Sequence, residues 1–179
     1  SEHPGLIKET EINPIGDIKL KLSLVDSTSV SKSASQHGVA FWLGGRLLGS
    51  PSWSIHGRQV LDGRKTFAKR YTLIAQSDDL LDYVEADWSG FKNDFSAIEL
   101  ITDQISSFVK ACYFELSKTE VDTAKRHVFS HHKSDLKELP RLAQKELYDF
   151  VDTILCENPD IKIELLELAF KAAINLEKS

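Results

Sequence analysis

The chain has 179 residues, of which 41% are hydrophobic and 27% are charged, and its formal net charge is −5. These values are typical of a soluble globular protein with one domain, or one domain and an appendage. The negative charge argues against broad electrostatic binding of nucleic acid. No apolar run reaches the roughly 18 to 20 residues of a membrane span and no signal peptide is evident, so we expect a cytoplasmic protein without a membrane partner.

The first part of the chain is rich in predicted strands. Residues 1–16 are polar and are interpreted as a segment that leads into the first domain. Apolar and polar residues alternate over 17–25, which predicts a half-buried strand. A serine-rich connection follows over 26–38. Two short strands are predicted over 39–49, because the pair Gly44-Gly45 is a strong hairpin signal.

The next segment changes from strand to helix periodicity. Turn-forming residues fill 50–67, and a strand is predicted over 68–76. Alternation predicts another strand over 81–86, which stops at the sequence ADWSGFK. From there, apolar residues at helical spacing predict one amphipathic helix over 95–117.

The remaining residues are predicted to be helical, with helices over 119–133, over 134–157 and at the C-terminus. Pro140 lies either near the start of the second helix or splits it. We therefore predict an α+β fold. A mixed sheet backed by helices occupies 17–117, and an all-helical extension occupies 118–179.

The chain holds two cysteines, Cys112 and Cys156, and no methionine. Each cysteine lies in an apolar helical pattern, so buried free thiols in a reducing cytosol are favoured over a disulfide. The missing methionine, even at position 1, predicts that the chain is a piece of a longer protein. Parts of an active site would then lie outside it.

Basic residues give two candidate phosphate contacts. Gly44-Gly45-Arg46 combines accessible backbone amides with a guanidinium group, but no glycine-rich nucleotide pattern surrounds it, so a hairpin turn is the favoured interpretation. The densest basic stretch is a candidate nucleic-acid contact, with a solvated surface as the alternative. We call it the basic strip, and it consists of Arg58, Arg64, Lys65, Lys69 and Arg70.

Metal and catalytic signals are weak. His127 and His131 have the spacing of a helical zinc pair, with His132 beside them. The glutamate of an HExxH motif and a third ligand are missing, so a solvated helix end is favoured and no metal is expected. No GxSxG nucleophile elbow is present and no carboxylate pair can be singled out, so no catalytic residue is predicted.

Lys92 is the last residue of the corner ADWSGFK and lies just before the predicted helix. A cation there opposes the helix dipole and costs a few tenths of a kcal/mol, so a functional reason gains weight.

Two segments followed by a long helix resemble the transducer domain of the GHKL ATPases. They are FWLGGR (41–46), similar to the family's FVNGR strand, and ADWSGFK (86–92), similar to its DVNVHPTK corner, with SGF replacing the His-Pro region. The family includes DNA gyrase B, the mismatch-repair ATPase, a heat-shock chaperone and the microrchidia proteins. The resemblance covers about residues 15–117.

The resemblance implies a fold like the second domain of a small-subunit ribosomal protein. It also implies a corner lysine that contacts the γ-phosphate of ATP held by a neighbouring domain, and Lys92 matches that lysine by motif position. A lysine point charge on a flexible stem suits a terminal phosphate. Such a contact would make the corner's position depend on the nucleotide state.

The helical extension is similar to the segment after the ATPase domain in large bacterial ATP-binding proteins, some of them in phage defence. The family's nucleotide motifs are absent from the 179 residues. We therefore expect this piece to bind neither ATP nor Mg²⁺ and to hydrolyse nothing by itself. The full-length protein would be an ATPase that uses both, dimerises with itself, and contains an N-terminal ATPase domain as the partner of this piece.

Two other functions stay open. One is a DNA-binding or other nucleic-acid-binding module that uses the basic strip. The other is a helical scaffold that docks a partner through an apolar stripe consisting of Leu165, Leu166, Leu168 and Phe170.

Overall fold

The computed structural model describes residues 4–27 and 37–179 of the chain. It has the predicted α+β fold, with a mixed sheet in the first part and helices in the second. Contacts divide it into two compact units, which we call the sheet unit (Ser1–Val109) and the helical unit (Lys110–Ser179). Each unit is described by itself.

The sheet unit is built on five strands. They are β1 (Leu6–Ile15), β2 (Ile18–Asp26), β3 (Gly38–Leu43), β4 (Arg46–Ser52) and β7 (Tyr71–Ser77). Their order in the sheet is β1-β2-β7-β3-β4. Only β3 and β7 run parallel, and the other neighbours are antiparallel. The strand predicted over 17–25 is confirmed as β2.

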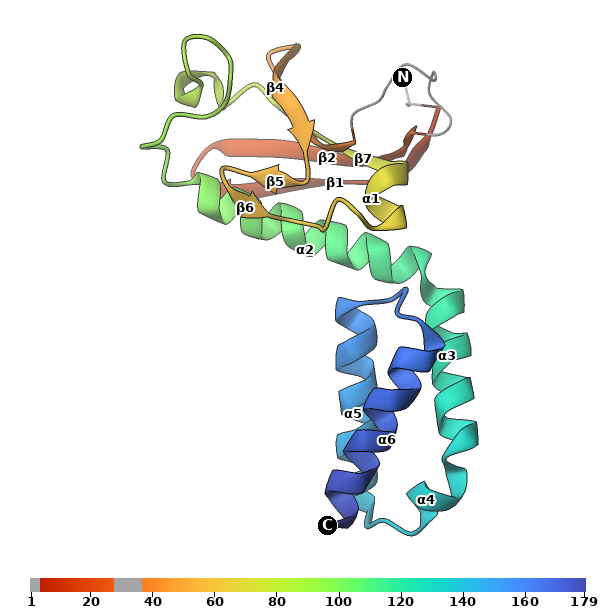
Figure 1. Cartoon of the computed structure of the whole chain (residues 1–179). Helices are drawn as coiled ribbons and strands as arrows, with labels where there is room; N and C mark the ends of the chain where they lie inside the picture. Colours follow the sequence, from red (N-terminus) through yellow and green to blue (C-terminus); the bar gives the residue numbers. More distant parts are fainter. Residues whose placement is uncertain (1–3, 28–36) are drawn as a thin grey trace. The chain divides into compact units, whose positions relative to one another are not determined.

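One face of the sheet is buried, and the other is only partly exposed, because its residues Ser23 and Ala40 are also buried. Leu22, Ala75 and Phe41 lie in one row across β2, β7 and β3, and all three are buried. The next row places Lys21, Gln76 and Trp42 on the opposite face, where they are exposed. The long helix α2 (Ile98–Leu116) runs along the sheet in Figure 1. Its buried residues in this unit are Ile98, Ile101, Thr102, Ile105 and Val109.

The glycine pair forms the predicted hairpin. Leu43 pairs with Arg46, which leaves Gly44 and Gly45 as a two-residue turn with φ of 58° and 81°. A turn with positive φ at both central residues matches the right-handed twist of the strands, and glycine adopts it without strain.

Two predictions near the ends of the sheet were wrong or incomplete. Residues 1–16 are not merely a leading segment, since β1 forms the edge of the sheet. An edge strand exposes much of its length and tolerates Pro14, which explains its polar sequence. The segment 68–76 begins as the short helix α1 (Thr66–Arg70) before it becomes β7.

The strand predicted over 81–86 was also wrong. Leu81–Tyr83 is a 3₁₀ turn (η2), and only the single bridge between Val84 and Phe91 follows it. The chain leaves the sheet at Ser77, whose hydroxyl donates to the Lys19 carbonyl oxygen at 2.7 Å. An alternating sequence without a partner strand cannot complete a ladder. The predicted loop over 26–38 falls mostly on 28–36, outside the described residues.

The helical unit contains the end of α2 and four further helices. These are α3 (Lys118–His131), α4 (Lys133–Lys137), α5 (Arg141–Glu157) and α6 (Ile163–Lys178). Pro140 immediately precedes α5 and separates it from α4, so the segment predicted as one helix over 134–157 is two helices. The core of the unit is a continuous apolar cluster, whose most buried members are Val121, Val128, Leu147, Val151, Leu155, Leu166 and Phe170.

The predicted boundary between 117 and 118 is the junction of α2 with α3, whereas the two units meet inside α2. Both cysteines are free thiols. Cys112 is buried as expected, but Cys156 is exposed, because it lies on the side of α5 away from the buried residues Val151 and Leu155. Within residues 4–27 and 37–179, no helix is long and apolar enough to cross a membrane.

Candidate functional site

The segment ADWSGFK belongs to a closed loop that starts at Tyr83. From here on we call the whole loop, residues 83–92, the corner. The Lys92 N–H donates to the Tyr83 carbonyl oxygen at 2.8 Å, and the Glu85 N–H donates to that of Gly90 at 2.9 Å. Inside the loop, the Trp88 N–H donates to the Glu85 carbonyl oxygen at 2.9 Å. The corner therefore has a defined backbone although it belongs to no sheet.

The tip of the corner is strained and is held by the β3–β4 hairpin. Trp88 has a φ of 59°, a conformation that costs a non-glycine residue roughly 1–2 kcal/mol. The Gly49 N–H donates to the Trp88 carbonyl oxygen at 2.9 Å, and the Arg46 guanidinium lies 4.4 Å from the Trp88 ring centre. A Cβ atom on Gly49 would lie 2.6 Å from the Ser89 carbonyl oxygen, so only glycine fits there.

Aromatic rings fix the base of the corner. Phe91 meets Phe41 of β3 edge to face at 5.0 Å between ring centres, and it meets Phe95 at 5.5 Å. Tyr83 stacks on Phe95 at 4.2 Å. Such pairs each contribute about 0.5–1.5 kcal/mol beyond the area that they bury. The two segments that carry the family resemblance thus lie in direct contact, through Phe41 and Phe91 and through Arg46 and Trp88.

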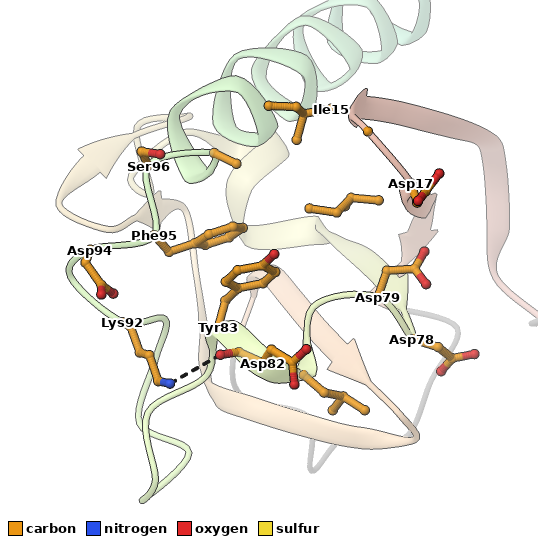
Figure 2. A pocket seen from close by; sticks show the side chains of 14 residues that line it. Ile15, Asp17, Asp78, Asp79, Asp82, Tyr83, Lys92, Asp94, Phe95 and Ser96 are labelled. Carbon is orange, nitrogen blue, oxygen red and sulfur yellow. Dashed lines mark hydrogen bonds between the residues drawn. The ribbon is translucent and has the colours of Figure 1, made fainter.

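Lys92 extends its side chain along the mouth of a pocket of about 870 Å³ (Figure 2). Its Nζ donates to the Asp82 carbonyl oxygen at 3.2 Å. Among the described residues, no carboxylate forms an ion pair with it. The side chain is exposed, so the ammonium group can reach a ligand outside this chain.

The pocket itself is strongly acidic. Its lining has one lysine and five aspartates, which are Asp17, Asp78, Asp79, Asp82 and Asp94. Figure 2 shows Asp78 and Asp79 on the side opposite Lys92. Five carboxylates around one pocket repel a free anion. The pocket alone is therefore a poor site for a nucleotide, and Lys92 suits a phosphate whose other charges are neutralised elsewhere.

The basic strip is largely compensated by carboxylates. Arg58 forms an ion pair with Asp103, and Arg70 bonds to Asp26 at 2.9 Å. Arg64 bonds to Asp62 at 3.0 Å. Its side-chain hydrogen bond, together with its backbone N–H, lowers the pKa of Asp62 to about 2.

Three of the five predicted nucleic-acid contacts, Arg58, Arg64 and Arg70, thus have internal partners. Lys65 caps the start of the short helix α1 and Lys69 lies in its last turn, and the two lysines complete the strip. The strip offers less free positive charge than its sequence suggests.

The histidines of the helical unit are mostly engaged. His132 is largely buried and bonds to Glu167 of α6, so the solvated helix end predicted there was wrong for this residue. His127 and His131 stack at 4.2 Å between ring centres. In the part of the chain that the structure describes, no group of three or more histidine, cysteine or acidic side chains is arranged to hold a metal.

The apolar stripe predicted on α6 divides between two faces. Leu166 and Phe170 are buried in the core of the helical unit, whereas Leu165 and Leu168 are 54% and 65% exposed. The helix therefore needs two of the four residues for its own packing. The other two are free to contact a partner.

The carboxylates at 78, 79 and 82 are evident in the sequence as an acidic cluster, but their place around Lys92 is not, and neither are two of the three aspartates that pair with the basic strip. Asp26 and Asp103 lie more than forty residues from Arg70 and Arg58 in sequence. Comparisons with known protein families, with curated proteins and with solved structures find no match for this chain.

Proposed function

We propose that this chain is the transducer portion of a GHKL-type ATPase. Lys92 completes the ATP site of a neighbouring domain by contacting the γ-phosphate, and the corner transmits the nucleotide state to the rest of the chain. The observation that carries the proposal is the exposed Lys92 ammonium group, which has no carboxylate partner among the described residues and projects from a corner with a fixed backbone.

The contacts of the corner support a role in transmission. A displacement of Lys92 would act on Phe91 and Phe95, which precede α2 by only a few residues. At the tip, the Gly49–Trp88 hydrogen bond connects the corner to β4. A phosphate that binds Lys92 only in one nucleotide state would bias these contacts by its differential affinity.

The acidic pocket supports a shared site, in which this chain supplies Lys92 and a neighbouring domain binds the nucleotide. Because the five aspartates around one lysine repel the phosphates of a nucleotide, the neighbouring domain of the longer protein would hold ATP together with its Mg²⁺. The isolated chain is then inactive, and the full-length protein is the ATPase, a homodimer that forms through its ATPase region.

The test is Lys92→Ala in the full-length protein. Loss of an electrostatic contact to the transferring phosphate should lower ATP hydrolysis by about 10²-fold. Lys21→Ala is the matched control, because Lys21 lies on the partly exposed face of the sheet and pairs with Glu9. Unchanged hydrolysis by Lys92→Ala, with a normal melting temperature, would remove Lys92 from the mechanism.

A second candidate, the helical scaffold, is favoured by the exposed leucines of α6. Leu165, Leu168 and Leu176 are all more than half exposed. Exposed apolar stripes of this kind commonly mark interaction sites. Leu165→Glu with Leu168→Glu should abolish partner binding without unfolding the helical unit, and retained binding would exclude this stripe.

A further inference from the structure

A second, smaller pocket is lined by other residues of the corner, Ser89, Gly90 and Phe91. It has a volume of about 310 Å³ and lies between the corner and the β5–β6 hairpin, formed by β5 (Ser54–Ile55) and β6 (Arg58–Gln59). Its floor is apolar and buried, with Val39, Phe41, Leu48, Ile55 and the half-buried Phe91 as its members. A pocket with an apolar floor and a few polar groups at its rim is the usual form of a small-molecule site.

The rim of this pocket is polar but carries neither a carboxylate nor a lysine or arginine. Its polar side chains are Ser50, Ser54, His56, Ser89 and Asn93. The three hydroxyl groups form no hydrogen bond with another described residue. His56 Nε2 and Asn93 Oδ1 are 3.4 Å apart, which is a long contact that a better partner can replace. The rim can therefore both donate and accept hydrogen bonds to a neutral ligand.

Two residues with a strained backbone lie in the lining of this pocket or next to it. His56 and Trp88 are the two non-glycine residues with positive φ in the described part of the chain. His56, with φ of 51°, forms the two-residue turn between β5 and β6 together with Gly57. Trp88 immediately precedes Ser89 and Gly90 of the rim. Strained conformations persist where the surrounding structure holds them, and they concentrate at binding sites.

From these observations we propose that the pocket binds a neutral planar heterocycle with adjacent hydrogen-bond donor and acceptor groups, of the nucleobase class. The ring would lie on the apolar floor beside Phe41 and Phe91. The Asn93 amide would pair with the edge of the heterocycle in the way that asparagine pairs with adenine, and His56 would supply a further hydrogen bond. This site is separate from Lys92 and requires no phosphate.

The proposal can be tested on the 179-residue chain by NMR titration with adenosine. We expect amide shifts at Gly49, Gly90 and Asn93, with a dissociation constant on the order of 1 mM, as is usual for a ligand of this size. Ribose 5-phosphate, which lacks the base, should produce none of these shifts. Absence of pocket shifts up to about 10 mM adenosine would overturn the proposal.

Two variants test the polar contacts. Asn93→Ala should weaken adenosine binding at least about tenfold, and Asn13→Ala on the exposed edge strand is the matched control. His56→Asn removes the imidazole but keeps a residue that tolerates positive φ, so the turn survives. If Asn93→Ala and His56→Asn both bind adenosine as tightly as the unchanged chain, each with an otherwise native spectrum, the proposed binding mode is contradicted.

A further titration distinguishes a base in a single-stranded nucleic acid from a free nucleoside. A short oligo-dA should bind more tightly than adenosine, and with a salt-dependent affinity, if the base is presented by a single strand. Equal, salt-independent affinities indicate a free nucleoside or related metabolite. Both results support the site. Failure of adenosine to bind would leave the phosphate contact of Lys92 untouched, because adenosine carries no phosphate.

Discussion

The sheet unit borders the pockets described above, whereas the helical unit is built around a continuous apolar cluster. In the helical unit, Lys125 bonds to Asp152 at 2.5 Å and Lys178 bonds to Asp135 at 2.6 Å. In the sheet unit, Lys92 has no carboxylate partner among the described residues, and the hydroxyl groups of Ser50, Ser54 and Ser89 form no hydrogen bond with another described residue. The pockets of about 870 Å³ and 310 Å³ beside the corner are lined by residues of the sheet unit. Both pockets that border the corner therefore belong to the sheet unit, whereas the helical unit contributes the exposed leucines of α6.

The largest expected effect concerns the core of the helical unit. Leu166→Ala removes a fully buried side chain, and we expect a loss of about 2–5 kcal/mol in the free energy of unfolding. Leu168→Ala changes an exposed leucine on the same helix and should cost less than about 0.5 kcal/mol. Urea denaturation followed by circular dichroism measures both. Equal costs would mean that α6 does not pack as described.

The next effect concerns the corner. Gly49→Ala forces a Cβ atom against the Ser89 carbonyl oxygen and adds positive-φ strain, so a loss of about 2–4 kcal/mol is expected. Gly45→Ala has positive φ but open space around it, and it should cost only about 1 kcal/mol. Thermal unfolding of the two variants gives the comparison. Similar melting temperatures would show that the hairpin does not hold the corner.

A third prediction concerns the arginines that carboxylates compensate. Replacing Asp26, Asp62 and Asp103 together by asparagine takes the net charge from −5 to −2 and frees three guanidinium groups. We expect DNA binding about tenfold tighter than that of the unchanged chain, with a salt dependence that steepens by up to about 0.9 per new phosphate contact. Fluorescence anisotropy at several salt concentrations measures this.

The converse result would revive the nucleic-acid alternative. If the unchanged chain already binds DNA strongly, and Arg64→Ala with Arg70→Ala abolishes binding, the basic strip is a functional surface despite its ion pairs. Substitution of Lys65 and Lys69, the two lysines of the strip, would then identify the remaining contacts.

The smallest expected effect is the pH dependence of the helical unit. The hydrogen bond from Lys178 lowers the pKa of Asp135 below its ordinary value. The carboxylate therefore stabilises the folded state above its unfolded pKa of about 3.9, and this contribution is lost as the pH falls through the lower folded value. Asp135→Asn should show a shallower decline in stability below pH 4. An identical decline would mean that the exposed pair is fully screened by solvent.

Local patterns in the sequence predicted much of the fold. Alternation over 17–25 identified β2, and the glycine pair at 44 and 45 identified the β3–β4 turn. Periodicity identified α2 to within a few residues. These signals succeed because a half-buried strand, a primed turn and an amphipathic helix each depend on residues that are close in sequence.

The failures and the site itself depend on residues that are far apart. Alternation at 81–86 cannot reveal that the chain has already left the sheet at Ser77. The sequence can identify Lys92 as an isolated cation, but not that Asp17 and Asp79 border the same pocket. Likewise, no local pattern predicts that Gly49 must approach Ser89 closely. Such facts arise only from tertiary packing.

The strand order has a consequence for how the protein is made. β7 lies between β2 and β3, so Ile74 pairs with Ser23 on one side and with Ala40 on the other. The β1–β2 hairpin can form early from neighbouring residues, but the sheet cannot close until β7 has been synthesised. Pairings between residues so distant in sequence slow folding. Until β7 inserts, the inner edges of β2 and β3 stay unpaired and are open to other chains, so correct assembly depends on the rate of that single step.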